Sequence, residues 1–296
     1  MNLQHFINER LKITSNTKSI NIKPTTKQEL KDIIEQELEQ QGPDADLNHI
    51  DTSLITDMSK LFINMDTKIS NLIKNSMNIR NIKIDKWDVS NVTDMSMMFY
   101  RCKDFNCDLS KWDVSNVDNM RSMFSGCSKF NSDLSKWDIS STTSTDNMFE
   151  ECSNFNSDLS KWNVSNVKSG SKMFWGCSDF NCDLSSWDVS NMTYMSFMFC
   201  KCTKFTGKGL DKWGPRVSNV EYLSGMFMNC ENLDVDLSSW KISNIYGIGS
   251  MFEGCKKFKS DLSHWDCTNV KYNDDRDVFK NCPNMLNNPQ LQPKFA

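Results

Sequence analysis

DLSKWDVSNVDNMRSMFSGCSKFN, residues 108–131, is the stretch of sequence that decides the fold, because close copies of it follow one another along most of the chain. The tryptophan of this unit recurs at fixed intervals, as Trp87, Trp112, Trp137, Trp162, Trp187, Trp213, Trp240 and Trp265. The intervals are 25, 25, 25, 25, 26, 27 and 25 residues, and only Trp175 falls outside the register. A constant period of this length is the signature of a repeat architecture, in which each unit packs on its neighbours.

Apolar residues keep the same period in further columns. Each unit carries a phenylalanine, a cysteine three residues later, a second apolar residue after that, and a leucine three residues before the tryptophan. In the quoted unit these residues are Phe124, Cys127, Phe130 and Leu109. One coil cannot bury its apolar side alone, whereas a stack of coils makes a continuous core. The sequence therefore predicts a solenoid whose core consists of these columns.

Two segments of each coil predict short regular structure. Met120, Met123, Phe124 and Cys127 stand at helical spacing, which predicts a short helix or 3₁₀ turn. The F-N-x-D-L-S-x-W-D-V segment alternates in part and predicts a short strand that pairs in parallel with its neighbours. A column of asparagines, interrupted by Ser141, is expected to bond backbone groups where the coil turns. The expected fold class is an α/β repeat with little secondary structure in each coil.

The unit also carries a family resemblance. WDVSNVTDM at residues 87–95, followed by MF-x-x-C at 98–102 and F-N-x-D-L at 105–109, resembles the BspA-type leucine-rich-repeat proteins, which are bacterial and viral surface or interaction proteins. The resemblance covers about residues 48–282. It implies a leucine-rich-repeat-like solenoid of short parallel strands and short helices, and binding rather than catalysis. It transfers no catalytic residues.

The chain divides into four regions. Residues 1–23 form an N-terminal arm, 24–47 a helical cap, 48–282 the repeat solenoid, and 283–296 a polar, proline-containing tail that closes the chain. The solenoid comprises a degenerate first coil and eight coils marked by tryptophan. The arm carries its own amphipathic pattern, which predicts either a small helix packed on the cap or a segment that docks on a partner.

The cap region predicts a helix with a clear start and stop. Thr26 followed by Glu29 is typical of a capping box, and Gly42 followed by Pro43 ends the helix. Between them runs one apolar stripe, made of Leu30, Ile33, Ile34 and Leu38. We expect this helix to cover the open end of the stack.

Composition excludes some partners. The net charge is −4, from 34 basic and 38 acidic residues mixed throughout the chain, so no basic stripe exists to follow a nucleic-acid backbone. No apolar run approaches the length of about 20 residues that crosses a bilayer, and the N-terminal sequence lacks the apolar segment of a signal peptide. We expect a soluble chain, either associated with a virion or cytoplasmic.

The sequence contains no pattern typical of an active site. The aspartates recur with the repeat, whereas catalytic residues would not, so we interpret them as structural; a calcium ladder is the alternative, but the glycine-rich repeat that binds calcium is missing. Histidine is limited to His5, His49 and His264, and the 12 cysteines are expected to be buried, reduced thiols rather than zinc ligands or disulfides. We expect no enzyme activity, no metal, no cofactor and no small-molecule substrate.

Positions that vary between coils are the candidates for binding. Apolar residues that the repeat does not require gather in neighbouring coils and suggest a patch made of Trp175, Tyr194, Phe197, Cys200, Tyr222 and Met228. The alternative is that these side chains fold inward. The expected function is a non-enzymatic module that binds another protein or assembly, as an adhesive or structural component of a virion or cell surface. The alternative function is an intracellular regulatory or inhibitory scaffold.

Overall fold

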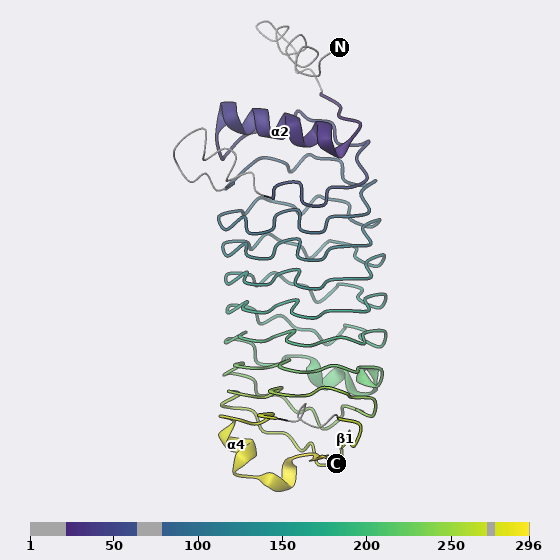
Figure 1. The fold of residues 1–296 in the computed structure, drawn as a ribbon, viewed down its shortest axis with the longest axis vertical. Coiled ribbons are helices and arrows are strands. Elements are labelled where there is room, and N and C mark those ends of the chain that lie inside the picture. The colour runs from purple at the N-terminus through teal and green to yellow at the C-terminus, as the bar shows by residue number, and fades with distance from the viewer. Residues whose placement is uncertain (1–21, 64–78, 271–275, 296) are drawn as a thin grey trace, which may run out of the picture.

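The computed structural model describes residues 22–63, 79–270 and 276–295, and it shows a tall stack of coils (Figure 1). Helix α2 lies across the N-terminal end of the stack, and α4 lies at the other end. Regular elements in the described residues occur near the two ends and in one irregular coil: α2 at Lys27–Gln41, η2 at Leu210–Lys212, η3 at Gly214–Val217, β1 at Asp266–Cys267, α4 at Pro283–Leu286, η4 at Pro289–Leu291 and β2 at Lys294–Phe295.

Neighbouring coils are joined in parallel register. Isolated parallel bridges connect equivalent residues of successive coils along one column, which reads Asp57, Asp94, Asn119, Ser144, Ser169, Tyr194, Tyr222 and Gly247. The bridges lie immediately before the M-x-x-M-F segment. The strand expected in the F-N-x-D-L-S-x-W-D-V segment is therefore absent from the regular coils that the structure describes, which are joined at a single bridged residue outside that segment. Strand β1, directly after Trp265, is the exception.

The segment in which we expected a short helix or 3₁₀ turn forms separate tight turns and no helix. We call it the turn wall, which comprises residues 94–101 and the equivalent segments 119–126, 144–151, 169–176, 194–201, 222–229 and 247–254. Alternate N–H groups donate to the next coil: Met95 to the carbonyl of Asn119 at 3.0 Å and Met97 to that of Arg121 at 2.8 Å. The N–H groups between them close tight turns, as Met98 does to Met95 at 3.2 Å. A helix would keep these bonds within its own segment.

Left-handed backbone allows this arrangement. Met97 has φ +57° and Arg101 has φ +63°, and their equivalents repeat these values in two columns. All non-glycine residues with positive φ in the described ranges belong to these columns, although such residues usually avoid this region. The bonds to the next coil therefore override local preference.

Aromatic rings stack from coil to coil inside the molecule. Phe99 and Phe124 lie with ring centroids 5.6 Å apart and planes 6° apart, and Phe99 also stacks on Phe105 at 4.0 Å. Trp87 and Trp112 stack in the same way at 6.5 Å. Stacked aromatic pairs add about 0.5–1.5 kcal/mol each beyond the area that they bury.

Polar atoms in and around this core bond to the preceding coil. The indole N–H of Trp137 donates to the carbonyl of Leu109 at 3.0 Å, and the thiol of Cys152 donates to that of Phe124 at 3.0 Å. Most equivalent tryptophans and cysteines do the same. Trp265 is an exception, because its buried N–H has no acceptor among the residues that the structure describes.

The asparagine and aspartate columns hold turns of the backbone. Asn116 donates its amide to the carbonyl of Ser90 in the preceding coil at 2.8 Å, as the sequence predicted. Asp108 accepts from the backbone N–H of Ser110 at 2.9 Å, and hydrogen bonds from the side chain and backbone of Ser110 hold the pKa of this carboxyl below its usual range. The recurring aspartates thus have a structural role in the turns.

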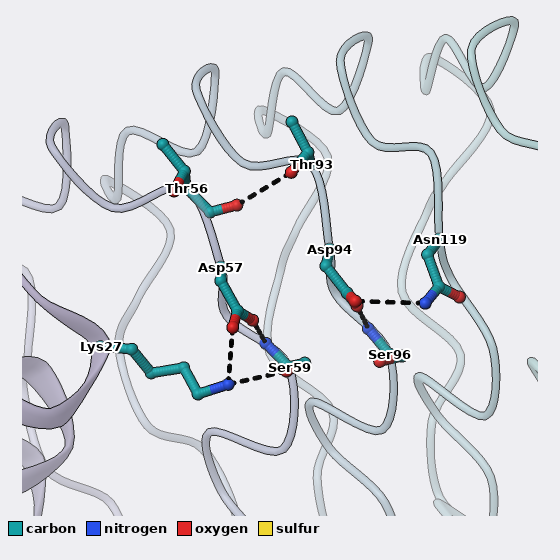
Figure 2. Close-up of polar contacts among 8 residues, drawn as sticks. All are labelled: Lys27, Thr56, Asp57, Ser59, Thr93, Asp94, Ser96 and Asn119. Carbon is teal, nitrogen blue, oxygen red and sulfur yellow. Dashed lines mark hydrogen bonds and ion pairs between the residues drawn. The ribbon is translucent and has the colours of Figure 1, made fainter.

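The N-terminal helix α2 packs on the first coil. Its apolar stripe is buried, and the hydroxyl of Thr26 accepts from the N–H of Glu29 at 3.2 Å. The ammonium of Lys27 reaches the first coil, where it contacts Asp57 at 2.8 Å and Ser59 at 2.7 Å (Figure 2). Nearly all of the N-terminal arm lies outside the described residues.

The C-terminal tail packs against the last coils. Strand β2 pairs in parallel with β1, and Leu262 donates its N–H to the carbonyl of Leu291 at 2.8 Å. The extra residues around Trp213 form η2 and η3, where Gly209 adopts φ +88°. A Cβ atom at Gly209 would lie 2.3 Å from the backbone nitrogen of Ser185, so the irregular coil needs glycine there.

Candidate binding surface

The outer side chains of the turn wall change character along the stack. The bridged column begins with Asp57, Asp94 and Asn119, continues with two serines, and then carries Tyr194 and Tyr222. The backbone is the same throughout, since the parallel bridges follow one register. The change therefore lies in the side chains alone.

The polar end of the column is occupied by internal contacts. Asp57 binds Lys27 of α2, and Asp94 accepts from the backbone N–H of Ser96 at 2.7 Å and from the amide of Asn119 at 3.2 Å (Figure 2). A lysine and a serine hydrogen bond lower the pKa of Asp57 against the opposing effect of its burial, which is the largest single influence. These side chains hold the cap and neighbouring coils together.

Further along the stack, three tyrosines form what we call the tyrosine ladder: Tyr194 and Tyr222 of the turn wall, and Tyr246, which directly precedes the wall in the next coil. The first two rings lie 5.2 Å apart with planes 8° apart, and the second and third lie 6.2 Å apart at 45°. Tyr194 is 46% exposed, Tyr246 is 40% exposed, and Tyr222 is half-buried between them. The ladder forms an exposed aromatic strip that crosses three coils.

Tyr246 was missed by sequence reasoning. It occupies the position directly before the bridged column, where Thr93, Lys168 and Glu221 stand in other coils. A comparison of this column would have found it, because an aromatic residue there is as unusual as one at position 194.

Other residues of the predicted patch lie partly inside. Phe197 is half-buried and has φ +58°. Its ring lies so close to Gly225 that a Cβ atom there would be 2.3 Å from it. Met228 is also half-buried. Cys200 is only 2% exposed, and burial raises the pKa of its thiol to about 11. Its inclusion in the patch was wrong, because the thiol folds inward instead of facing a partner.

Trp175 lies at a shallow, open hollow of about 480 Å³ on the turn-wall side. The ammonium of Lys201 lies 4.4 Å from the centre of its ring, a favourable cation–π contact. Lys103, Gly126 and Glu151 also line the hollow, and none of the three tyrosines does. The structure therefore separates the tyrosine ladder from the hollow at Trp175, and Phe197 lies in the same coil as Tyr194.

The side chains that the structure describes form no group of three or more residues suited to hold a metal ion. All 12 cysteines are free and buried. Within the same residues, no helix has the length and apolar character required to pass through a bilayer.

Comparison with known proteins identifies a family. Its model, described as "Mycoplasma protein of unknown function, DUF285", matches residues 67–187, 138–217 and 171–291, which together span about three quarters of the 296 residues. None of the curated proteins compared with the chain matches it. Overlapping matches of one model are expected from a tandem repeat, so the predicted repeat is confirmed. The chain belongs to this DUF285 family of repeat proteins.

Proposed function

We propose that the chain is a non-enzymatic repeat module that binds another protein through the tyrosine ladder and the adjoining Phe197. The observation that carries the proposal is the exposed strip of rings in which Tyr194 stacks on Tyr222 and Tyr246 packs against Tyr222 at a tilt. Tyrosine and tryptophan are favoured anchors of protein interfaces, because they bring large apolar area together with a polar group.

The finer family assignment belongs to the same proposal. We infer a BspA-type, leucine-rich-repeat-like solenoid, supported by the 25-residue unit and by the parallel register of its coils. Such a module suits an adhesive or structural component of a larger assembly, such as a virion or a cell surface. Repeat stacks serve this purpose because each coil adds surface without changing the core.

An intracellular regulatory or inhibitory scaffold is the second candidate function. It uses the same surface and differs in its partner. Size measurements distinguish the two: the assembly component is monomeric when purified alone and is recovered in a large particle from its native source, whereas a scaffold is recovered in a small complex.

The test of the proposed function compares two variants of a tagged full chain. Tyr194→Ser combined with Tyr246→Ser removes the exposed ends of the ladder, while Leu54→Ser removes an apolar side chain that is 49% exposed on the first coil. Proteins recovered with the wild type from its native source are quantified by mass spectrometry, and the leading partner is then purified for calorimetry.

The ladder variant should lose the partner, with affinity weakened by about 2 kcal/mol or more, while the Leu54 variant retains it. Both variants should melt within a few degrees of the wild type, since exposed residues contribute little to stability. Equal binding by all three proteins would refute the proposed surface.

A further inference from the structure

The tyrosine ladder offers hydrogen-bond donors as well as apolar surface. Tyr194 and Tyr222 are stacked nearly face to face, so their contact covers ring faces and leaves ring edges accessible. Across residues 22–63, 79–270 and 276–295, no hydrogen bond to the hydroxyls of the three tyrosines occurs. A ligand can therefore meet both apolar ring edges and phenolic O–H donors.

The backbone beneath the ladder is already occupied. Tyr222 donates its N–H to Thr193 at 3.3 Å, and its carbonyl accepts from Met195 at 3.0 Å. Because these bonds run between coils, an incoming β-strand finds no free ladder of N–H and C=O groups here. Recognition must come from side chains.

An extended ligand that needs no strand pairing fits these conditions. A polyproline II helix has no internal hydrogen bonds, so its carbonyls remain available as acceptors, and it loses little conformational entropy on binding. Tyrosine suits such a ligand, because its ring packs against proline and its hydroxyl donates to the exposed carbonyls.

The periods of the two structures also agree. Bridged chains are about 4.8 Å apart, so two coil steps, the separation from the coil of Tyr194 to that of Tyr246, measure about 9.6 Å. One turn of polyproline II contains three residues and rises about 9.3 Å. Prolines three residues apart can therefore reach Tyr194 and Tyr246, whose coils are two steps apart, when the ligand lies along the axis of the stack.

An acidic residue belongs to the same stretch of backbone as the ladder. Glu221 directly precedes Tyr222, and its carbonyl accepts the N–H of Tyr246 at 2.8 Å, so its backbone adjoins that of both tyrosines. Glu221 is half-buried, and no cation pairs with it in the described portion of the chain. A lysine or arginine next to the prolines would complement this carboxylate.

We propose that the tyrosine ladder binds a proline-rich segment of the partner protein in the polyproline II conformation, with a basic residue of that segment placed at Glu221. This inference rests on the proposed function and names the chemistry of its partner.

The probe is a fluorescent decaproline peptide with an arginine at one end, titrated with the full chain and followed by anisotropy. We expect saturable binding with a Kd in the micromolar range. Tyr222→Ser should weaken it by about tenfold or more, Tyr222→Phe should weaken it less, and Tyr100→Ser should leave it unchanged. Tyr100 is a matched control, because it is a half-buried tyrosine on the same wall outside the ladder. Glu221→Gln should abolish the preference for the arginine-bearing peptide over uncharged decaproline.

Two controls address other ligands and loss of folding. A glycine-serine peptide of equal length and charge should not bind, and thermal melts should show each variant folded. The inference would be overturned if the glycine-serine peptide bound as tightly as the arginine-bearing decaproline, or if that decaproline did not bind at about 1 mM. Binding of soluble β-glucan oligosaccharides in place of the peptide would overturn it as well. If decaproline fails while the native partner still depends on Tyr194 and Tyr246, only this inference falls. If neither ligand depends on the ladder, the proposed function falls as well.

Discussion

The two ends of the turn wall share one backbone and differ in what their outer side chains contact. Near the N-terminus, Asp57 is bound by Lys27 and Asp94 by Asn119. In the later coils, Tyr194 and Tyr246 remain substantially exposed. Because bonds between backbones hold the wall together, its outer positions are free to specialise. One end uses them to attach the cap, and the other leaves them open to a partner.

The largest effect should come from raising the pH, which acts on the core beneath both ends alike. Burial raises the pKa of Cys127 in the earlier coils, and in the later coils it raises the pKa of Cys182 and Cys200 from 9.0 to about 11, which means that the fold favours the neutral thiol. Stability is then complete below pH 9 and is lost as pH rises through 11. Melting temperatures measured from pH 7 to 11 under reducing conditions should fall steeply above pH 9. A flat profile would contradict the burial of the thiols.

A second test asks whether the core is equivalent at the two ends. Phe99 lies beneath the polar end and Phe199 beneath the aromatic end, and both are fully buried. Phe99→Ala and Phe199→Ala should each cost about 3–5 kcal/mol in the free energy of unfolding, because each leaves a cavity in a stacked column. Urea denaturation measures both. A difference above about 2 kcal/mol would show that the ends differ in their cores and not only in their surfaces.

A smaller difference in stability between the two ends is expected at the column of residues equivalent to Met97, which have positive φ. Gly225→Ala should destabilise by about 1–3 kcal/mol, since the new methyl would meet the ring of Phe197. Ser122→Gly, at the equivalent position of an earlier coil with φ +54°, should stabilise by up to about 1 kcal/mol by relieving backbone strain. Thermal melts of the two variants should therefore shift in opposite directions. Shifts of the same sign would contradict this explanation.

The smallest effects concern the outer side chains themselves. Lys27→Ala removes a partly exposed ion pair and should cost about 1 kcal/mol or less, an effect that weakens further in high salt. Tyr194→Ser should also change the melting temperature little. Only the tyrosine variant should lose partner affinity. If Tyr194→Ser lowers the melting temperature by many degrees, its ring belongs to the core and the contrast between the two ends disappears.

The periodic part of the structure could be predicted from the sequence. The tryptophan interval placed Trp112 and Trp137 in successive coils, and the asparagine column predicted bonds such as that from Asn116. Composition and spacing carry this information because each coil buries the same kinds of side chain at equivalent positions. The stripe through Leu30 and Ile34 likewise marked the buried face of α2.

The turn wall could not be predicted in this way. Its apolar spacing imitates a helix, and neither Met97 nor Arg101 is a residue that favours left-handed backbone. The conformation follows from bonds to the next coil, which no local pattern reveals. The burial of Cys200 could not be predicted either. It stands at a position that varies between coils, and the path of the backbone through the turn decides whether a side chain there faces inward or outward.

Each kind of hydrogen bond between coils keeps its own direction along the stack. Indole, thiol and asparagine donors reach backward to the preceding coil, as from Trp137, Cys152 and Asn116, whereas the N–H groups of the turn wall reach forward, as from Met95. A duplicated unit inserted between two coils would therefore bring a matching donor for every acceptor that it offers. The molecule can lengthen or shorten by whole units without a new kind of junction. The number of units between the cap and the tyrosine ladder then sets the distance between them.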